Sequence, residues 1–307
     1  MRPNRSESDA GLSRRTFVGG AAGTALLAGA VGAQVAAPKA ERGPHKAVLY
    51  SMLPGNLTVE DRMKLARDVG FEGVEAPPLA DPKEQERLRA AAEAAGIRIH
   101  SVIYGGWDPP LSSPDPQAAA QSLKNAEAAL RCAKALGADD ILLVPAVVDA
   151  RTRYVEAYRR AQQAIRRLVP FAEQLQVKIC LEEVWNNFLL SPLEFAAFVD
   201  SFHSPWVGAY FDVGNVVPFA WPQDWIRTLG HRIQKVHLKD FKGGPGLFGG
   251  IGGHFVNLLE GSIDWPEVRR AFAEIGYTGY MTTELAGGDA AYLRDVSQRV
   301  DKILAGS

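Results

Sequence analysis

The sequence predicts an α/β protein built as a single (β/α)8 TIM barrel. Beyond about residue 45, short apolar segments alternate with amphipathic ones, and this alternation is typical of βα units. Several short segments are continuously apolar, such as Ile141-Leu142-Leu143-Val144, which indicates strands buried on both faces of a parallel sheet. Eight such units in about 250 residues fit a closed barrel.

Eight segments are predicted as strands, and in chain order they are Ala47–Met52, Gly73–Ala76, Ile97–Tyr104, Asp140–Val144, Lys178–Glu183, Gly208–Asp212, Lys235–Leu238 and Tyr280–Glu284. An open, doubly wound sheet is the alternative. Against it, no G-x-G-x-x-G turn follows the first strand, and dinucleotide-binding sheets of that kind use such a turn. The closed barrel is therefore favoured.

The helices between these strands are predicted from their ends. A capping side chain, in several cases followed by proline at the first helical position, marks helix starts at Thr58, Asp81, Asp115, Ser191 and Asp264. Glycines that can adopt the left-handed conformation mark helix ends near Gly70, Gly96, Gly137 and Gly276. The segment Asp240–Asp264 is glycine-rich and is predicted as one long loop on the catalytic face.

Residues 1–36 are predicted to be a twin-arginine signal peptide that is removed. Ser13-Arg14-Arg15-Thr16-Phe17 precedes a weakly apolar run, and Val31 and Ala33 are placed for cleavage. A membrane anchor is the alternative, but the apolar run of about 14 residues is shorter than the roughly 20 that span a bilayer. We expect export to the periplasm or another extracytoplasmic compartment, no stable membrane insertion after processing, and a barrel domain at residues 45–307.

The charge of the chain indicates no nucleic-acid partner. The formal net charge is -1 at pH 7, and no predicted helix carries the basic stripe that such partners require.

Four successive predicted strands end in ionisable residues. They are Glu182, Asp212, His237 and Glu284, with Glu183 as the alternative to Glu182. The carboxyl ends of barrel strands meet on one face, and carboxylates buried there are costly unless they are paired or bind a cation. Three carboxylates and one imidazole suit one divalent metal, Mn²⁺ first, with Mg²⁺, Co²⁺ or Zn²⁺ as alternatives.

Four stretches carry a family resemblance. They are EEVWNNFLLSP at 182–192, YFDVGN at 210–215, VHLKD at 236–240, and Gly276-Tyr277 with Glu284. With these stretches the chain resembles the xylose-isomerase-like barrel superfamily over about residues 46–304, in particular sugar 3-epimerases and hydroxypyruvate-isomerase-like proteins. The resemblance implies that the four strand-end residues bind one metal. It also implies a small-molecule carbohydrate as partner and a homodimer or tetramer.

The resemblance further implies a metal-dependent isomerase or epimerase of a small sugar or keto-sugar. Glu182 and Glu284 are expected to be catalytic, one removing the proton beside a ketone and the other returning a proton while the metal stabilises the enediolate. Asn215 departs from the pattern, because sugar epimerases of this group often carry histidine at that position. An amide can bind a hydroxyl group but cannot shuttle a proton.

Further residues near strand ends are candidates for substrate contact, and they are Asn215, Lys239, Asp240, Trp185, His100 and Glu75. Trp185 is placed to stack on a sugar face. Lys239 and Asp240 follow the predicted metal histidine and are placed to contact hydroxyl groups or a phosphate. For each of these candidates, the alternative is a packing, structural or solvated role.

Three other functions remain open. The same carbanion chemistry would serve a metal-dependent lyase or dehydratase acting on a keto-sugar, keto-inositol or 3-keto-glycoside. A non-catalytic sugar-binding barrel is the second alternative. Endonuclease IV-like cleavage with several metals is the third, but it needs more strand-end histidines than the six in this chain supply. The expected export favours a free sugar, keto-sugar or glycoside over a sugar phosphate.

Overall fold

The computed structural model describes residues 43–244 and 252–306. The predicted signal peptide lies outside the described residues. The described residues belong to one compact unit, Glu41–Ser307. Among them, no helix is both long and apolar enough to cross a membrane.

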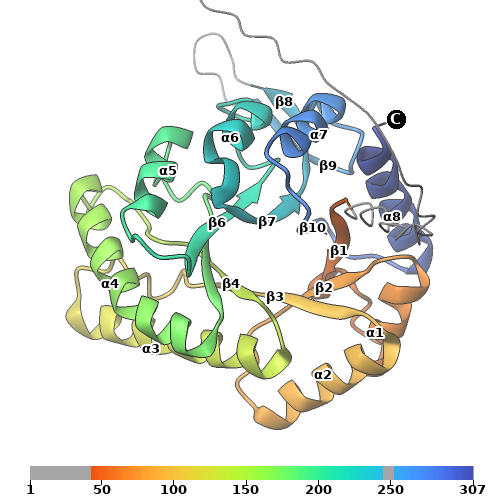
Figure 1. Cartoon of the computed structure of the whole chain (residues 1–307), viewed down its shortest axis with the longest axis horizontal. Coiled ribbons are helices and arrows are strands. Elements are labelled where there is room, and N and C mark those ends of the chain that lie inside the picture. The colour runs from red at the N-terminus through yellow and green to blue at the C-terminus, as the bar shows by residue number, and fades with distance from the viewer. Residues whose placement is uncertain (1–42, 245–251, 307) are drawn as a thin grey trace, which may run out of the picture. The chain divides into compact units, whose positions relative to one another are not determined.

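Eight parallel strands close into a barrel (Figure 1), which confirms the predicted fold class. Neighbouring strands follow the order β1-β10-β7-β6-β5-β4-β3-β2. Their bounds are β1 (His45–Leu49), β2 (Gly73–Ala76), β3 (Arg98–Gly105), β4 (Asp140–Leu143), β5 (Lys178–Leu181), β6 (Val207–Asp212), β7 (Ile233–Leu238) and β10 (Tyr280–Thr283). The parallel register of β6 and β7 sets Asp212 directly beside His237.

Several predicted strands extend too far at their carboxyl ends. Val144, Glu182, Glu183 and Glu284 follow their strands, and the last residues of the first predicted strand form a 3₁₀ turn at Tyr50–Met52. Three of the four residues beyond the strands, Val144, Glu182 and Glu183, are still buried. A buried position in the sequence therefore does not show where the hydrogen bonding between strands ends.

Helices ring the barrel (Figure 1), and they are α1 (Val59–Asp68), α2 (Pro82–Ala95), α3 (Pro116–Leu136), α4 (Tyr154–Leu175), α5 (Pro192–Asp200), α6 (Pro222–Leu229), α7 (Trp265–Glu274) and α8 (Ala290–Ala305). The predicted caps at Thr58, Asp81, Asp115, Ser191 and Asp264 all accept a backbone N–H from the first turn. Gly96 and Gly137 end their helices in the left-handed conformation, as predicted.

The prediction of one long loop after β7 is wrong in part. Strands β8 (Asp240–Gly244) and β9 (Gly252–Val256) form an antiparallel hairpin, with Gly243 opposite Gly253. A Cβ atom on Gly253 would lie 2.2 Å from the ring of Phe241. The glycines that looked like loop signals therefore allow backbone and ring to approach closely.

The barrel interior beneath the carboxyl ends of the strands is partly polar. Leu142, Val144, Cys180 and Tyr210 form a small apolar cluster. Glu75, His100 and Lys235 are buried polar residues. The large apolar core lies mainly between the strands and the helices. Buried polar groups inside a barrel need hydrogen-bond partners, and here those partners connect to the site described next.

Candidate metal centre

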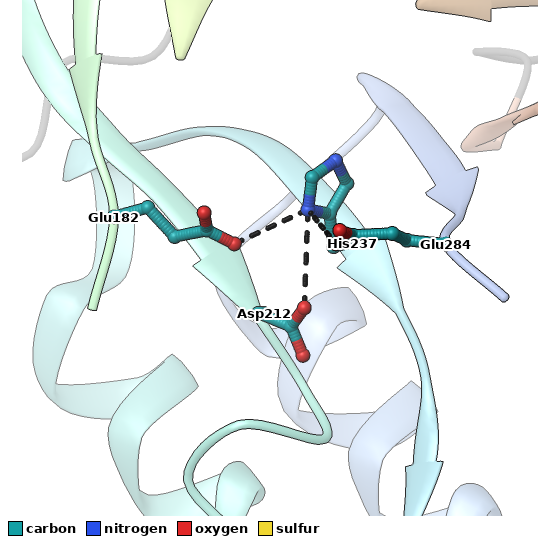
Figure 2. Close-up of side chains that lie close together, drawn as sticks. All are labelled: Glu182, Asp212, His237 and Glu284. Atoms are coloured by element: carbon teal, nitrogen blue, oxygen red, sulfur yellow. Dashed lines mark hydrogen bonds and ion pairs between the residues drawn. The ribbon is translucent and has the colours of Figure 1, made fainter. Parts of the chain in front are cut away.

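Four side chains converge at the carboxyl ends of β5, β6, β7 and β10. Glu182, Asp212, His237 and Glu284 each offer one ligand atom, and these atoms all lie within 4.8 Å of one another. Nδ1 of His237 is the centre of the group, at 2.8 Å from Oε2 of Glu284, 3.2 Å from Oε1 of Glu182 and 3.8 Å from Oδ2 of Asp212. Figure 2 shows the two glutamates approaching from opposite sides. We call these four residues the strand-end cluster.

Adjacent residues of the loop after β5 diverge. Glu182 joins the strand-end cluster, whereas Oε1 of Glu183 accepts the backbone N–H of Trp185 at 2.8 Å. Oε2 of Glu183 is buried and has no hydrogen-bond partner among the described residues. The geometry therefore places Glu182, and not the alternative Glu183, in the cluster.

Burial and mutual charge shape the protonation of the cluster. Burial raises the pKa of Glu182 to about 7 and that of Glu183 to about 8. Burial alone would raise the pKa of Glu284 too, but the charges of His237 and Lys239 outweigh it and hold that pKa well below its usual range. For His237, burial opposes the charged form, yet Glu284 and Glu75 raise its pKa well above the usual value.

Lys239 adds a positive charge to the cluster. Its Nζ lies 2.9 Å from Oε2 of Glu284 and 3.1 Å from Oδ2 of Asp212, and it donates to Oδ1 of Asn215 at 3.4 Å. Burial disfavours the ammonium, but the charges of Asp212 and Glu284 prevail and raise the pKa of Lys239. This predicted substrate candidate therefore stands beside the expected metal ligands.

The donor set of the cluster fits a divalent cation. Oδ2 of Asp212 and Oε2 of Glu284 are buried and make ion contacts but no hydrogen bond within the described part of the chain. Three carboxylates held this close, two of them buried and Glu284 half-buried, repel one another unless positive charge lies among them. Oxygen ligands with one imidazole suit Mn²⁺, Mg²⁺ or Co²⁺. The cluster can therefore hold a metal ion.

Two predicted substrate candidates lie beneath the cluster instead of beside a substrate. Oε2 of Glu75 is 2.7 Å from Nε2 of His237 and also accepts the hydroxyl of Tyr210 at 2.8 Å. Nε2 of His100 is 3.0 Å from Oγ1 of Thr282. Glu75 and His100 are fully buried, so they support the site from below. Sequence reasoning missed Tyr210, because it is 135 positions from Glu75 and no local pattern links them.

Asp240 does not face the cluster either. Its Oδ2 accepts the indole N–H of Trp265 at 3.0 Å and the backbone N–H of Gly261 at 3.1 Å. The side chain is fully buried. Asp240 therefore ties the hairpin to the start of α7, which is a structural role.

Asn215 connects the cluster to Trp185. Its backbone N–H donates to Oδ1 of Asp212 at 2.9 Å, its Nδ2 donates to the carbonyl of Glu183 at 3.1 Å, and its own carbonyl accepts the indole N–H of Trp185 at 2.7 Å. Trp185 stands on a strained backbone, with φ of 63°, which is uncommon for a bulky residue and is found at functional sites. Its ring stacks on Phe255 of β9, with centroids 5.2 Å apart.

Known proteins share this fold and parts of this sequence. The sequence profile of the xylose isomerase-like TIM barrel matches residues 63–301. A relative from Haemophilus influenzae, named provisionally as an L-ribulose-5-phosphate 3-epimerase, is 27% identical over 212 residues, which are 64% of this chain and 73% of the relative. A protein of the same name from Escherichia coli is 25% identical over 260 residues, or 78% of this chain and 88% of that protein.

Solved structures support the same fold. A structure of L-ribulose 3-epimerase superposes with a TM-score of 0.71 at 19% identity, covering 85% of this chain and 95% of that one. A D-tagatose 3-epimerase-like protein gives a TM-score of 0.71 at 20% identity, covering 85% and 98% of the two chains. At 19% and 20% identity, this similarity shows a shared fold and nothing more.

Proposed function

The chain belongs to the xylose isomerase-like TIM barrel family, and from that premise we propose that it is a metal-dependent isomerase or epimerase of a small sugar or keto-sugar. The observation that carries the proposal is the approach of Glu182 and Glu284 to one shared cluster from opposite sides (Figure 2). Two carboxylates placed on either side of a substrate can remove a proton from one face and return a proton to another. The names of the two relatives support the sugar class.

In this proposal Glu182, Asp212, His237 and Glu284 hold one divalent cation, with Mn²⁺ first among the candidates. When bound, the cation supplies positive charge against the substrate oxygens, which makes the C–H next to the ketone more acidic. His237 must present a neutral Nδ1 for this role, so protons compete with the metal.

The two glutamates are proposed to carry the proton. Glu182 and Glu284 approach the cluster from opposite sides (Figure 2). One carboxylate would remove the proton beside the ketone, and the other would return a proton to the intermediate. Such a pair meets the needs of a two-base epimerisation.

Lys239 and Asn215 are proposed to position the substrate. The ammonium of Lys239, next to Glu284 and Asp212, is placed to donate a hydrogen bond to a substrate oxygen that gains negative charge. The amide of Asn215 already contacts Glu183 and Lys239. We assign it to holding the loop and binding a hydroxyl group, because an amide does not transfer protons at neutral pH.

The test is a screen of keto-sugars with Mn²⁺-loaded protein in deuterated water. We expect deuterium to enter the carbon next to the ketone, and we expect Glu182→Gln and Glu284→Gln each to lower this rate by about 10² to 10⁴. Glu173→Gln, on the exposed side of α4, is the matched control. Unchanged exchange in both site variants would refute the proposal. Net loss of water or of an aglycone would favour the lyase alternative instead.

We also propose that the chain is exported by the twin-arginine route and therefore acts on a free sugar, keto-sugar or glycoside. The support is Arg14-Arg15 with the apolar run that follows. The relatives are named for a sugar phosphate, so turnover of matched ketoses and ketose phosphates decides this point. Arg14→Lys with Arg15→Lys is expected to retain the protein in the cytoplasm, and continued export of that variant would contradict the proposal.

A further inference from the structure

A cavity lies beside the loop that carries Glu182, and Glu183 of that loop lines it. It has a volume of about 500 Å³ and is lined by Glu183, Trp185, Asn187, Leu190, Pro218 and Phe219. These residues belong to the loops that follow β5 and β6. Its size is within the roughly 300–1,000 Å³ of small-molecule sites. We call it the rim cavity.

The lining of the rim cavity combines an aromatic surface with an unsatisfied acid. Glu183 is only 4% exposed, and its Oε2 has no hydrogen-bond partner among the described residues. A buried polar atom in this condition is costly unless a ligand or water contacts it. Asn187 adds an amide whose Nδ2 donates to the carbonyl of Val148, and its Oδ1 remains as an acceptor.

Trp185 offers the cavity a fixed ring face. Its indole N–H is held by the carbonyl of Asn215, and one face of the ring stacks on Phe255. Phe255 does not line the cavity, so the part of Trp185 that does is a different surface. Trp185 is 49% exposed, so part of its ring is open to a ligand. Aromatic faces with a few polar groups are the usual chemistry for binding a sugar ring.

Two chains of contact connect the lining of the rim cavity to the strand-end cluster. One runs from Asp212 through Asn215 to Trp185 by hydrogen bonds. The other runs from Lys239, whose Nζ lies 5.3 Å from the ring centroid of Phe255, to the Phe255–Trp185 stack. Trp185 is thus only a few side-chain contacts from the cluster, so a substrate needs more than one ring to occupy both places.

We propose that the rim cavity is a subsite for a second pyranose ring, so that the substrate class is a keto-sugar joined to another sugar. This inference rests on the proposed function, because it places the reacting ring at the strand-end cluster. The ring of the second sugar stacks on Trp185, and its hydroxyl groups form hydrogen bonds with the Glu183 carboxyl group and donate to Oδ1 of Asn187.

The test compares one-ring and two-ring probes on the full-length, Mn²⁺-loaded protein by titration calorimetry. The matched pairs are D-fructose with lactulose, and 3-keto-D-glucose with 3-keto-cellobiose. We expect the two-ring member of at least one pair to bind about tenfold more tightly. Trp185→Ala is expected to reduce that advantage to about twofold or less. Leu190→Ser changes an exposed lining position, so it should fold normally and also reduce the advantage.

Trp221→Ala is the control, because Trp221 is 61% exposed and does not line the cavity. Trp221→Ala should still bind the two-ring probe more tightly than the one-ring probe. Equal affinity for one-ring and two-ring probes in both pairs would overturn the inference, and so would an unchanged advantage in Trp185→Ala and Leu190→Ser. If one-ring keto-sugars exchange deuterium without any two-ring preference, the subsite fails and the proposed function stands. If no keto-sugar exchanges deuterium but two-ring binding depends on Trp185, the proposed function fails and the subsite stands.

Discussion

His237 is held in one orientation by the residue beneath it. Oε2 of Glu75 lies 2.7 Å from Nε2 of the imidazole, so Nδ1 faces Glu182 and Glu284. Both Glu75 and His237 are fully buried. A carboxylate on the far nitrogen of a metal-binding histidine fixes its tautomer and raises its basicity as a ligand. Glu75 is thus a positioning residue for the proposed metal site.

The first residue-level prediction concerns Glu75→Gln. The amide keeps a hydrogen-bond acceptor but loses the negative charge, so we expect Mn²⁺ affinity to fall about tenfold while circular dichroism stays unchanged. Ser101→Ala is the control, because Ser101 contacts Glu75 at 3.2 Å without touching His237. Equal Mn²⁺ dissociation constants for Glu75→Gln and the unmodified protein would show that Glu75 does not position the histidine.

The second residue-level prediction concerns pH. Burial raises the pKa of Glu183 from 4.5 to about 8, so the folded protein keeps this proton where the unfolded chain loses it. The stability that this protonated carboxyl provides is full below about pH 4.5 and is lost as pH rises through about 8. Glu183→Gln is neutral at every pH. In metal-free protein, the Tm of Glu183→Gln relative to that of the unmodified chain should therefore rise between pH 5 and pH 9. A constant difference between the two Tm values would contradict this.

At the scale of elements, the β8–β9 hairpin brings an aromatic ring to the site. Its strand β9 carries Phe255, which stacks on Trp185 and lies near Lys239. Asp240, the first residue of β8, fixes the base of the hairpin by accepting N–H groups from Gly261 and Trp265. The position of the hairpin therefore depends on one buried carboxylate.

Asp240→Asn tests this anchoring. The new amide group would face donors that need an acceptor, and a buried donor left without a partner costs about 1–3 kcal/mol. We expect a loss of about 2 kcal/mol in the free energy of unfolding by urea, whereas Lys242→Ala, at an exposed position in the same strand, should change it little. A loss no larger than that of the control would show that Asp240 is not an anchor.

Local chemistry made some elements predictable and left others hidden. The caps at Thr58, Asp81 and Asp115 were predicted because each acts on backbone groups two or three residues away. The hairpin was missed because its glycines resemble loop residues, and their role depends on the approach of Phe241. The contacts of Glu75 and Asp240 were not predictable for a similar reason, since their partners are distant in sequence.

At the scale of the whole molecule, closure of the barrel assembles the cluster. The strands whose carboxyl ends carry the four residues, β5, β6, β7 and β10, are consecutive neighbours in the barrel. Asp212 pairs in register with His237, and His237 with Thr282. A slip of one residue would turn a ligand to the other face of the sheet. The grouping of the four residues was predictable from strand-end position, because parallel strands present their carboxyl ends on one face.

The most direct test of the central claim is anomalous X-ray scattering at the manganese edge from crystals of the Mn²⁺-loaded protein. We predict one strong peak per chain, bounded by Glu182, Asp212, His237 and Glu284, and its loss in Asp212→Asn. A peak at any other place, or no peak at full Mn²⁺ loading, would contradict the claim that the ends of these four strands hold one catalytic divalent cation.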